Sequence, residues 1–91
     1  MSGAVYIAEI HISAPTERKI NTKHYVTSDE VREALVLRKD VEAAWDDHPQ
    51  HGRRVVALGQ TAAGRPILAV LQEVDPSDGV WNLRTARSPR S

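Results

Sequence analysis

The chain has 91 residues, with 12 basic and 12 acidic side chains, so its formal net charge is zero. A chain of this length predicts one domain with a small core, and zero net charge argues against a surface that binds polyelectrolytes generically. The absence of cysteine excludes disulfides, thiolate metal sites and a cysteine nucleophile. Since neither a signal-peptide pattern nor an apolar run of about 18 residues occurs, we expect a soluble, cytoplasmic protein without membrane association.

The charges are segregated along the chain. The segment 29–47 carries seven acidic and three basic side chains, whereas 53–65 and 81–91 each carry three arginines and no acid. Such blocks suit a protein that binds an anion on one face and a basic partner on another, and they also suit an ordinary solvated surface.

The first two expected elements are a strand and a short helix. Residues 5–12 alternate imperfectly, which predicts a strand with Tyr6, Ala8, Ile10 and Ile12 on one face and Val5, Ile7, Glu9 and His11 on the other. Ser13, Pro15 and Glu17 then predict a helix start, because proline fits a first turn and an acid there complements the helix dipole. This helix is polar and runs toward Lys23.

A second helix is expected from Ser28 to Arg38. Thr27 and Glu30 have the spacing of a capping box, and Val31, Ala34, Leu35 and Arg38 fall on one stripe. Residues 41–45 are compatible with a strand or with more helix. The composition of 46–52, DDHPQHG, predicts a loop.

The block 51–71, HGRRVVALGQTAAGRPILAVL, predicts a β-hairpin. Its apolar runs 55–58 and 67–71 are of strand length, and Gly64 lies near the end of the polar connection. A tight turn at 75–79 and a strand at 80–87 follow. In that strand Trp81, Leu83, Thr85 and Arg87 are expected on one face, and Val80, Asn82, Arg84 and Ala86 on the other.

This order of elements predicts an α+β domain over residues 1–87. We expect a small antiparallel sheet of four to five strands with both helices packed on one face. Residues 88–91, SPRS, are expected to form a disordered tail, since nothing in them can fold alone.

Arginines from the expected sheet suggest where chemistry takes place. Neighbouring strands would bring several of them into one patch that can hold an RNA backbone and stabilise charge on a phosphate in transfer. RNA cleavage further needs only a base and an acid, because the 2′-hydroxyl is the nucleophile. His24, His48 and His51 could supply these. The arginines concerned are Arg53, Arg54, Arg65, Arg84 and Arg87.

Two other site types are weaker. The spacing of His48 and His51 beside Asp46 and Asp47 invites a metal site, but it lacks the helical spacing that places two imidazoles on one face, so ordinary loop histidines are favoured. Trp45, Trp81 and Tyr25 could stack on bases. With no phenylalanine in the chain, the tryptophans are better interpreted as core anchors.

The run 20–35, INTKHYVTSDEVREAL, the block 51–71 and the closing LRTAR resemble the BrnT family of bacterial toxins. That family comprises ribonucleases of type II toxin–antitoxin pairs with a fold similar to RelE. The matching positions are Lys23-His24, the helix from Asp29 to Leu35, Arg53-Arg54, Gly59-Gln60-Thr61 with Gly64-Arg65, and Thr85-Ala86-Arg87.

The resemblance implies a metal-independent endoribonuclease that uses no cofactor, inhibits translation and is held inactive by a cognate antitoxin. It implies catalytic roles for Lys23, His24, Arg53, Arg65 and Arg87, with His24 as general acid or base and Arg65 and Arg87 on the scissile phosphate. Substrate-binding roles are expected for Arg54, Arg84 and His51.

Two alternatives remain open. The chain could be a non-catalytic member of the same fold that binds RNA or a protein. It could also be a small self-associating domain, such as a homodimer, because exposed sheet edges invite pairing.

Overall fold

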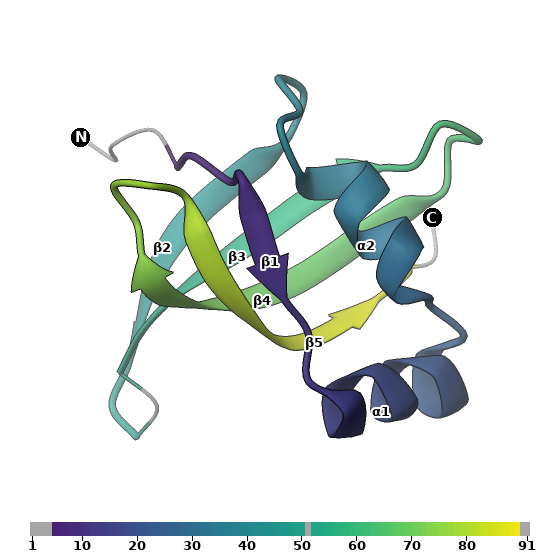
Figure 1. Cartoon of the computed structure of the whole chain (residues 1–91), viewed down its shortest axis with the longest axis horizontal. Coiled ribbons are helices and arrows are strands. Elements are labelled where there is room, and N and C mark those ends of the chain that lie inside the picture. Colours follow the sequence, from purple (N-terminus) through teal and green to yellow (C-terminus); the bar gives the residue numbers. More distant parts are fainter. Residues whose placement is uncertain (1–4, 51, 90–91) are drawn as a thin grey trace.

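The structure is a computed structural model that describes residues 5–50 and 52–89. Its seven elements, drawn in Figure 1, form an α+β domain of two helices and one five-stranded sheet, which confirms the predicted fold class. None of the described helices is long and apolar enough to cross a membrane. The elements are β1 (Glu9–His11), α1 (Ala14–His24), α2 (Ser28–Leu35), β2 (Glu42–His48), β3 (Gly52–Gln60), β4 (Pro66–Asp75) and β5 (Val80–Arg87).

The sheet has the strand order β1-β5-β4-β3-β2. Strands β2 to β5 form an antiparallel meander, as predicted, while β1 lies parallel to β5 at the edge. A parallel neighbour needs a long crossover connection, and here the whole segment from α1 to β4 separates the two strands. The sheet is therefore mixed rather than purely antiparallel.

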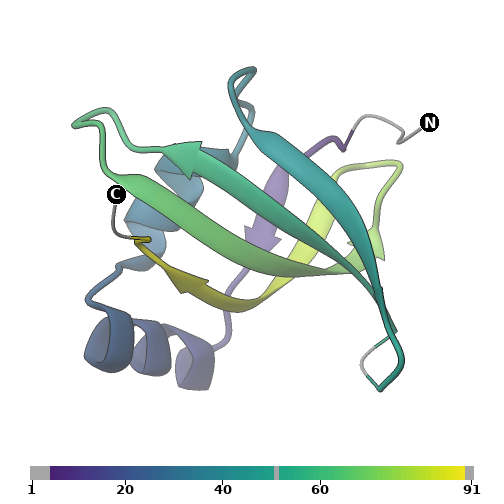
Figure 2. The ribbon, with the colours of Figure 1, turned by 180° about the vertical axis from the view of Figure 1, so that it is seen from behind.

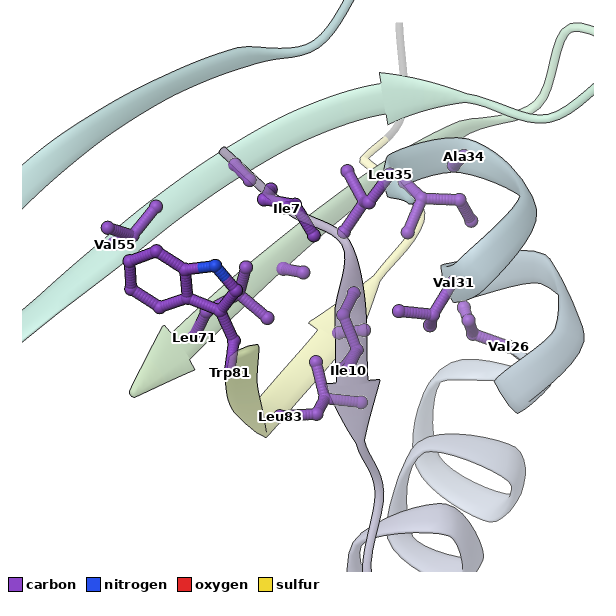
Figure 3. Close-up of a cluster of buried hydrophobic side chains, with 14 of the residues drawn as sticks. Ile7, Ile10, Val26, Val31, Ala34, Leu35, Val55, Leu71, Trp81 and Leu83 are labelled. Atoms are coloured by element: carbon purple, nitrogen blue, oxygen red, sulfur yellow. The ribbon is translucent and has the colours of Figure 1, made fainter. Parts of the chain in front are cut away.

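The sheet is strongly curled around its core. Trp45 on β2 and Trp81 on β5 have ring centroids 5.5 Å apart, although β3 and β4 lie between these strands in the sheet. Trp81 is 1 % exposed, and its indole N–H donates to the carbonyl oxygen of Tyr6 at 2.8 Å. Figure 3 shows its ring beside Val55 and Leu71. Trp81 is thus the core anchor that the sequence predicts, and Trp45 packs against the edge of that core.

Helix α2 packs on β3 and β4 through its apolar stripe. Val31, Ala34 and Leu35 are buried and point into the core in Figure 3. Gly59 on β3 lies directly beneath the helix, because a Cβ at this position would be 2.3 Å from the carbonyl oxygen of Ala34. The absence of a side chain at Gly59 is what allows so close an approach.

The expected strand at residues 5–12 is wrong in length and in alternation. Only Glu9–His11 is strand, and Ile7 and Ile10, three residues apart, are both buried. The backbone N–H groups of Ala8 and Glu9 both donate to the carbonyl oxygen of Gly79. Two successive residues thus share one acceptor on the neighbouring segment. The alternation of buried and exposed side chains is therefore shifted by one position between Ile7 and Ile10.

Helix α2 ends at Leu35, three residues before the expected end at Arg38. The backbone leaves the helix because Val36 is extended and Leu37 has a φ of 54°. Arg38 folds back instead, and its guanidinium donates to the carbonyl oxygen of Glu33 and to Asp40. The side chain that was expected to widen the apolar stripe therefore caps the C-terminal end of the helix.

The prediction of a loop at 46–52 is wrong for 46–48 and for Gly52. The sequence left residues 41–45 open between strand and helix, and the structure shows strand from Glu42 onward. Strand β2 continues to His48, and β3 begins at Gly52. The polar composition and the breakers Pro49 and Gly52 suggested a loop, but Asp46 and Asp47 pair across the strands with Arg54 and Arg53. Opposite charges on neighbouring strands stabilise such a pairing.

The predicted faces of β5 are correct only as far as Leu83. Trp81 and Leu83 are buried, but the next buried residue is Ala86 rather than Thr85. Leu83 pairs with Leu71 and Thr85 with Val70, so Arg84 is the extra residue of a β-bulge. A bulge reverses the alternation beyond it and bends the strand.

Candidate functional site

Arg65 is joined to α2 by a salt bridge. Its Nη1 donates to both carboxylate oxygens of Glu30 at 2.8 and 2.7 Å. The turn before it requires Gly64, whose φ is 86°, and Thr61 accepts a hydrogen bond from the backbone N–H of Arg65 at 3.1 Å. The hairpin thus positions Arg65 as expected, but its partner is a carboxylate of the chain itself. Its assignment to the scissile phosphate stays a prediction, and that role requires Glu30 to be displaced.

Arg53 and Arg54 lie at the opposite end of the hairpin. Arg54 Nε donates to Asp46 at 2.9 Å, and the guanidinium of Arg53 stacks 4.0 Å above the ring of Trp45. Arg54 pairs with Gln72, while Arg65 precedes the other end of β4. Six residues of strand separate these ends, a distance of about 20 Å. The structure therefore does not bring all the predicted arginines into one patch.

Lys23 and His24 occupy the last turn of α1. Lys23 is exposed and follows Lys19 by one helical turn, so the two lysines lie on the same face of the helix. Arg87 is exposed near the end of β5, where it pairs with Leu68. In Figures 1 and 2 the C-terminal ends of α1 and β5 lie on the same side of the molecule.

The cations without a carboxylate partner concentrate on α1 and β5. Most of the acidic block is neutralised within the fold, because Glu30, Asp40, Asp46 and Asp47 each lie within 4.0 Å of an arginine nitrogen. Within residues 5–50 and 52–89, the five lysines and arginines of these two elements make no ion pair. They are Arg18, Lys19, Lys23, Arg84 and Arg87.

Two adjoining hollows are lined by residues of α1 and of the sheet. The larger has a volume of about 430 Å³ and the smaller about 190 Å³. Lys19, Gln72 and Arg84 line both, so the hollows form one continuous cleft, which we call the basic cleft. His11 lies at the end of the larger hollow and Arg54 in the smaller one, and no residue lining either is acidic. The complete lining is His11, Ser13, Pro15, Thr16, Lys19, Arg54, Val70, Gln72, Asn82, Leu83, Arg84 and Thr85.

The bulge in β5 positions Arg84 in this cleft. As the extra residue between Leu83 and Thr85, Arg84 is exposed, and its Nη1 donates to the side chain of Gln72 at 3.3 Å. Bulges commonly redirect a side chain beside a functional site. A guanidinium held in this way can bind a phosphate through two parallel hydrogen bonds.

A histidine and carboxylate pair lies at one end of the basic cleft. Nε2 of His11 is hydrogen-bonded to the carboxylate of Glu9 two residues earlier on β1. The ring is about half exposed and lines the larger hollow with Lys19 and Arg84. An imidazole oriented by a carboxylate and facing a cationic hollow can transfer protons to and from a bound phosphate ester.

The sheet face opposite the helices is uncovered. Figure 2 shows β2, β3 and β4 in front, with α2 behind them and α1 beside the sheet at the lower left. Four aliphatic side chains of β3 and β4 are only half buried there: Val56, Leu58, Leu68 and Val70. A shallow hollow of about 250 Å³ crosses β2, β3 and β4 on this face, and it is lined by Glu42, Ala43, Ala44, Val56, Leu58 and Leu68.

The sequence predicted part of this site. Arg54 and Arg84, both expected to bind substrate, lie in the basic cleft. Lys19 and His11 were missed, because Lys19 belongs to a polar helix and His11 to a strand face of mixed character. His51 lies outside the described residues, which include no group of three or more His, Asp or Glu side chains arranged to hold a metal ion.

Tail residues were expected to be disordered. Ser88 is half buried, and its hydroxyl donates to the carbonyl oxygen of Pro66 at 2.7 Å, while disorder of the tail stays a prediction. Arg90 and Ser91 lie outside the described residues.

Comparison of the chain with models of known protein families finds no match, and comparison with curated proteins finds none either.

Proposed function

We propose that this protein is a BrnT-like toxin, a metal-independent endoribonuclease of the cytoplasm that inhibits translation by cleaving RNA. The observation that carries the proposal is the basic cleft, in which the unpaired cations Lys19 and Arg84 converge beside Arg54, the partner of Asp46, and no lining residue is acidic. A cleft lined by cations can hold the phosphate backbone of a single strand. The short motifs that resemble the BrnT family point to the same activity.

The proposed reaction uses the 2′-hydroxyl of the substrate as nucleophile. A base removes its proton, the oxygen attacks the adjacent phosphorus, and the 5′-oxygen of the next nucleotide leaves with a proton from an acid. The products are a 2′,3′-cyclic phosphate and a 5′-hydroxyl. Lys19 and Arg84 stabilise the charge that develops on the phosphate oxygens. His11, beside these cations, and His24, at the end of α1, are the two candidates for proton transfer.

A protein partner belongs to the same proposal. An antitoxin would cover the basic cleft and the adjoining uncovered face of the sheet, where aliphatic side chains of β3 and β4 are half exposed. An acidic segment with apolar side chains matches both surfaces. The self-association alternative is weaker, because charged side chains on an edge strand discourage pairing with a second strand, and the edge strand β2 carries Glu42, Asp46 and Asp47.

The proposal is tested by incubating the purified protein with labelled single-stranded RNA in excess EDTA. We expect cleavage to persist, to yield 2′,3′-cyclic ends, and to be abolished when the substrate is fully 2′-O-methylated. Arg84→Gln and Lys19→Gln should each slow cleavage at least about 100-fold, a loss of the size found for groups that stabilise transition-state charge. Arg18→Gln, which removes an exposed cation of α1 outside the cleft, should leave the rate unchanged.

Comparing His11→Gln with His24→Gln identifies the proton-transfer group. The variant that lowers kcat and also removes one limb of the pH–rate profile marks the acid or base. Absence of cleavage together with normal RNA binding would establish the non-catalytic alternative. Induced expression with and without the neighbouring open reading frame then tests for the protein partner. We expect the protein to be toxic when expressed alone and the toxicity to be relieved when that reading frame is expressed with it.

A further inference from the structure

Tyr25 has a backbone conformation that aromatic residues rarely adopt. It caps the C-terminal end of α1 with a φ of 55° and a ψ of 39°, in the left-handed region. Its side chain is 78 % exposed, the largest value among the exposed large hydrophobic residues. Glycine adopts this conformation at no steric cost and is the usual residue there.

Burial does not compensate for this strain. A tyrosine ring that packed against the core would repay an unfavourable backbone, but most of this ring is in water. Strained residues that packing does not explain cluster at ligand-binding sites. The side chain of Tyr25 therefore invites a functional explanation.

The position of Tyr25 connects it with the basic cleft. Lys19 lines both hollows, and Lys23 follows it by one turn on the same face of α1. Tyr25 lies six residues after Lys19, about 9 Å further along the helix axis. A strand whose phosphates follow the two lysines and continue beyond Lys23 therefore reaches the end of the helix that Tyr25 caps.

We propose that Tyr25 is a base-stacking residue that selects unpaired RNA. The inference rests on the proposed function and adds the class of substrate to it. An exposed aromatic ring next to a line of cations is the arrangement by which proteins hold single strands, since every base offers a flat face. Bases within a duplex are stacked on one another and cannot reach such a ring.

Binding of fluorescein-labelled 2′-O-methyl oligonucleotides, which cannot be cleaved, separates this role from catalysis. We expect the wild type to bind a single-stranded 12-mer in fluorescence anisotropy and to bind the same sequence in a duplex more weakly. Tyr25→Gly should weaken single-strand binding at least about fivefold, the lower end of base–aromatic stacking. Its Tm should not fall, because glycine relieves the left-handed strain. Tyr25→Phe retains the ring and should bind as the wild type does.

Leu37→Gly is the matched control. Leu37 is the other non-glycine residue with positive φ in the described chain, at 54°, and is 67 % exposed, but it lies in the connection between α2 and β2. This substitution relieves the same kind of strain and removes an exposed apolar side chain away from the basic cleft. RNA binding should be unchanged.

The outcomes distinguish this inference from the proposed function. Wild-type binding that Tyr25→Gly leaves intact overturns the stacking role while the RNA site stands. Equal weakening by Leu37→Gly also overturns it, because the effect would then be general. If the wild type binds no RNA, both proposals fail. In another outcome, Tyr25→Gly binds RNA as the wild type does, but its toxicity is no longer relieved by the protein encoded in the neighbouring open reading frame. The ring then contacts that protein, and the stacking role is wrong.

Discussion

At the scale of single residues, the pair formed by Arg65 and Glu30 accounts for several features of the sequence at once. Glu30 completes the capping box with Thr27, whose backbone N–H donates to it at 3.0 Å, and it also accepts two hydrogen bonds from Arg65. One carboxylate thus joins the start of α2 to the end of the β3–β4 turn. The hydrogen bonds from Arg65 and the backbone of Thr27 hold the pKa of Glu30 below its ordinary value.

This lowered pKa makes the pair a source of pH-dependent stability. A carboxylate favoured in the folded state stabilises the fold above its unfolded-state pKa of about 4.3, and the contribution is lost as the pH falls through the lowered value. We expect Glu30→Gln to lower the free energy of unfolding by about 1–2 kcal/mol at pH 7. The difference from the wild type should shrink in urea titrations below pH 4.

Asp29→Asn is the control, because Asp29 is an exposed acid in the same first helical turn. It should change the free energy of unfolding by a few tenths of a kcal/mol only, the size of a helix-dipole contribution. A Glu30→Gln variant as stable as the wild type at pH 7 would show that the salt bridge contributes nothing to the fold.

Residue types on predicted strands identified part of the candidate site, because arginines near strand ends are readily noticed. Arg54 and Arg84 were found in this way. The sequence could not show that Arg65 is paired with Glu30, since the partners are 35 positions apart and meet only when α2 packs on the sheet. His11 was missed for the same reason, because the cleft it lines is built from α1, β4 and β5.

At the scale of elements, capping and turn signals predicted well and strand faces did not. The capping box places the start of α2 correctly, and Gly64 marks the β3–β4 turn. Both signals are local, so a few neighbouring residues determine them. The bulge at Arg84 and the shared acceptor Gly79 both shift an alternation by one residue, and each depends on a partner strand that the sequence does not reveal.

The contact between β3 and α2 leads to a prediction at this scale. Gly59→Ala introduces a Cβ 2.3 Å from the carbonyl oxygen of Ala34 and 3.1 Å from the side chain of Leu35. Backbone hydrogen bonds hold both α2 and β3 in shape, so neither can yield locally. The clash is therefore relieved only when α2 moves away from the sheet. We expect the free energy of unfolding, measured by urea denaturation, to fall by about 1–3 kcal/mol, as in overpacked cores.

Gly52→Ala provides the comparison, because a Cβ there meets nothing within 4 Å although the φ of 74° is strained. Its cost should reflect only that backbone strain, about 1 kcal/mol. Moving α2 should also displace Glu30 from Arg65, so Gly59→Ala should remove most of the pH dependence described above. A Gly59→Ala variant with wild-type stability would contradict the close approach of α2 to β3.

At the scale of the whole molecule, the curl of the sheet organises both core and cleft. The contact of Trp45 with Trp81 requires strands at different edges of the meander to face one another. The sharp bend of β5 that makes this contact is also where the bulge presents Arg84. Composition predicted the tryptophans as anchors, but the curl and the parallel β1 arise from packing over the whole chain and have no local signal.

Net charge at this scale conceals the distribution that matters. The total is zero, yet the acidic block is largely neutralised by arginines of its own fold, and two of the cations that make no ion pair, Lys19 and Arg84, line the basic cleft. RNA affinity depends on phosphates neutralised locally rather than on the total charge. A neutral chain can therefore bind RNA through a limited number of phosphates.

The salt dependence of RNA binding measures that number. Arg54 is already paired with Asp46, so with Lys19 and Arg84 each neutralising one phosphate of a single strand, we expect log Kobs to fall with log salt concentration at a slope of about −1.4. Arg84→Gln should reduce the magnitude of the slope by about 0.7, and Arg18→Gln should leave it unchanged. Anisotropy titrations at several salt concentrations supply these slopes. If both variants shift the slope equally, the charge of the whole surface determines binding and the basic cleft has no special part in it.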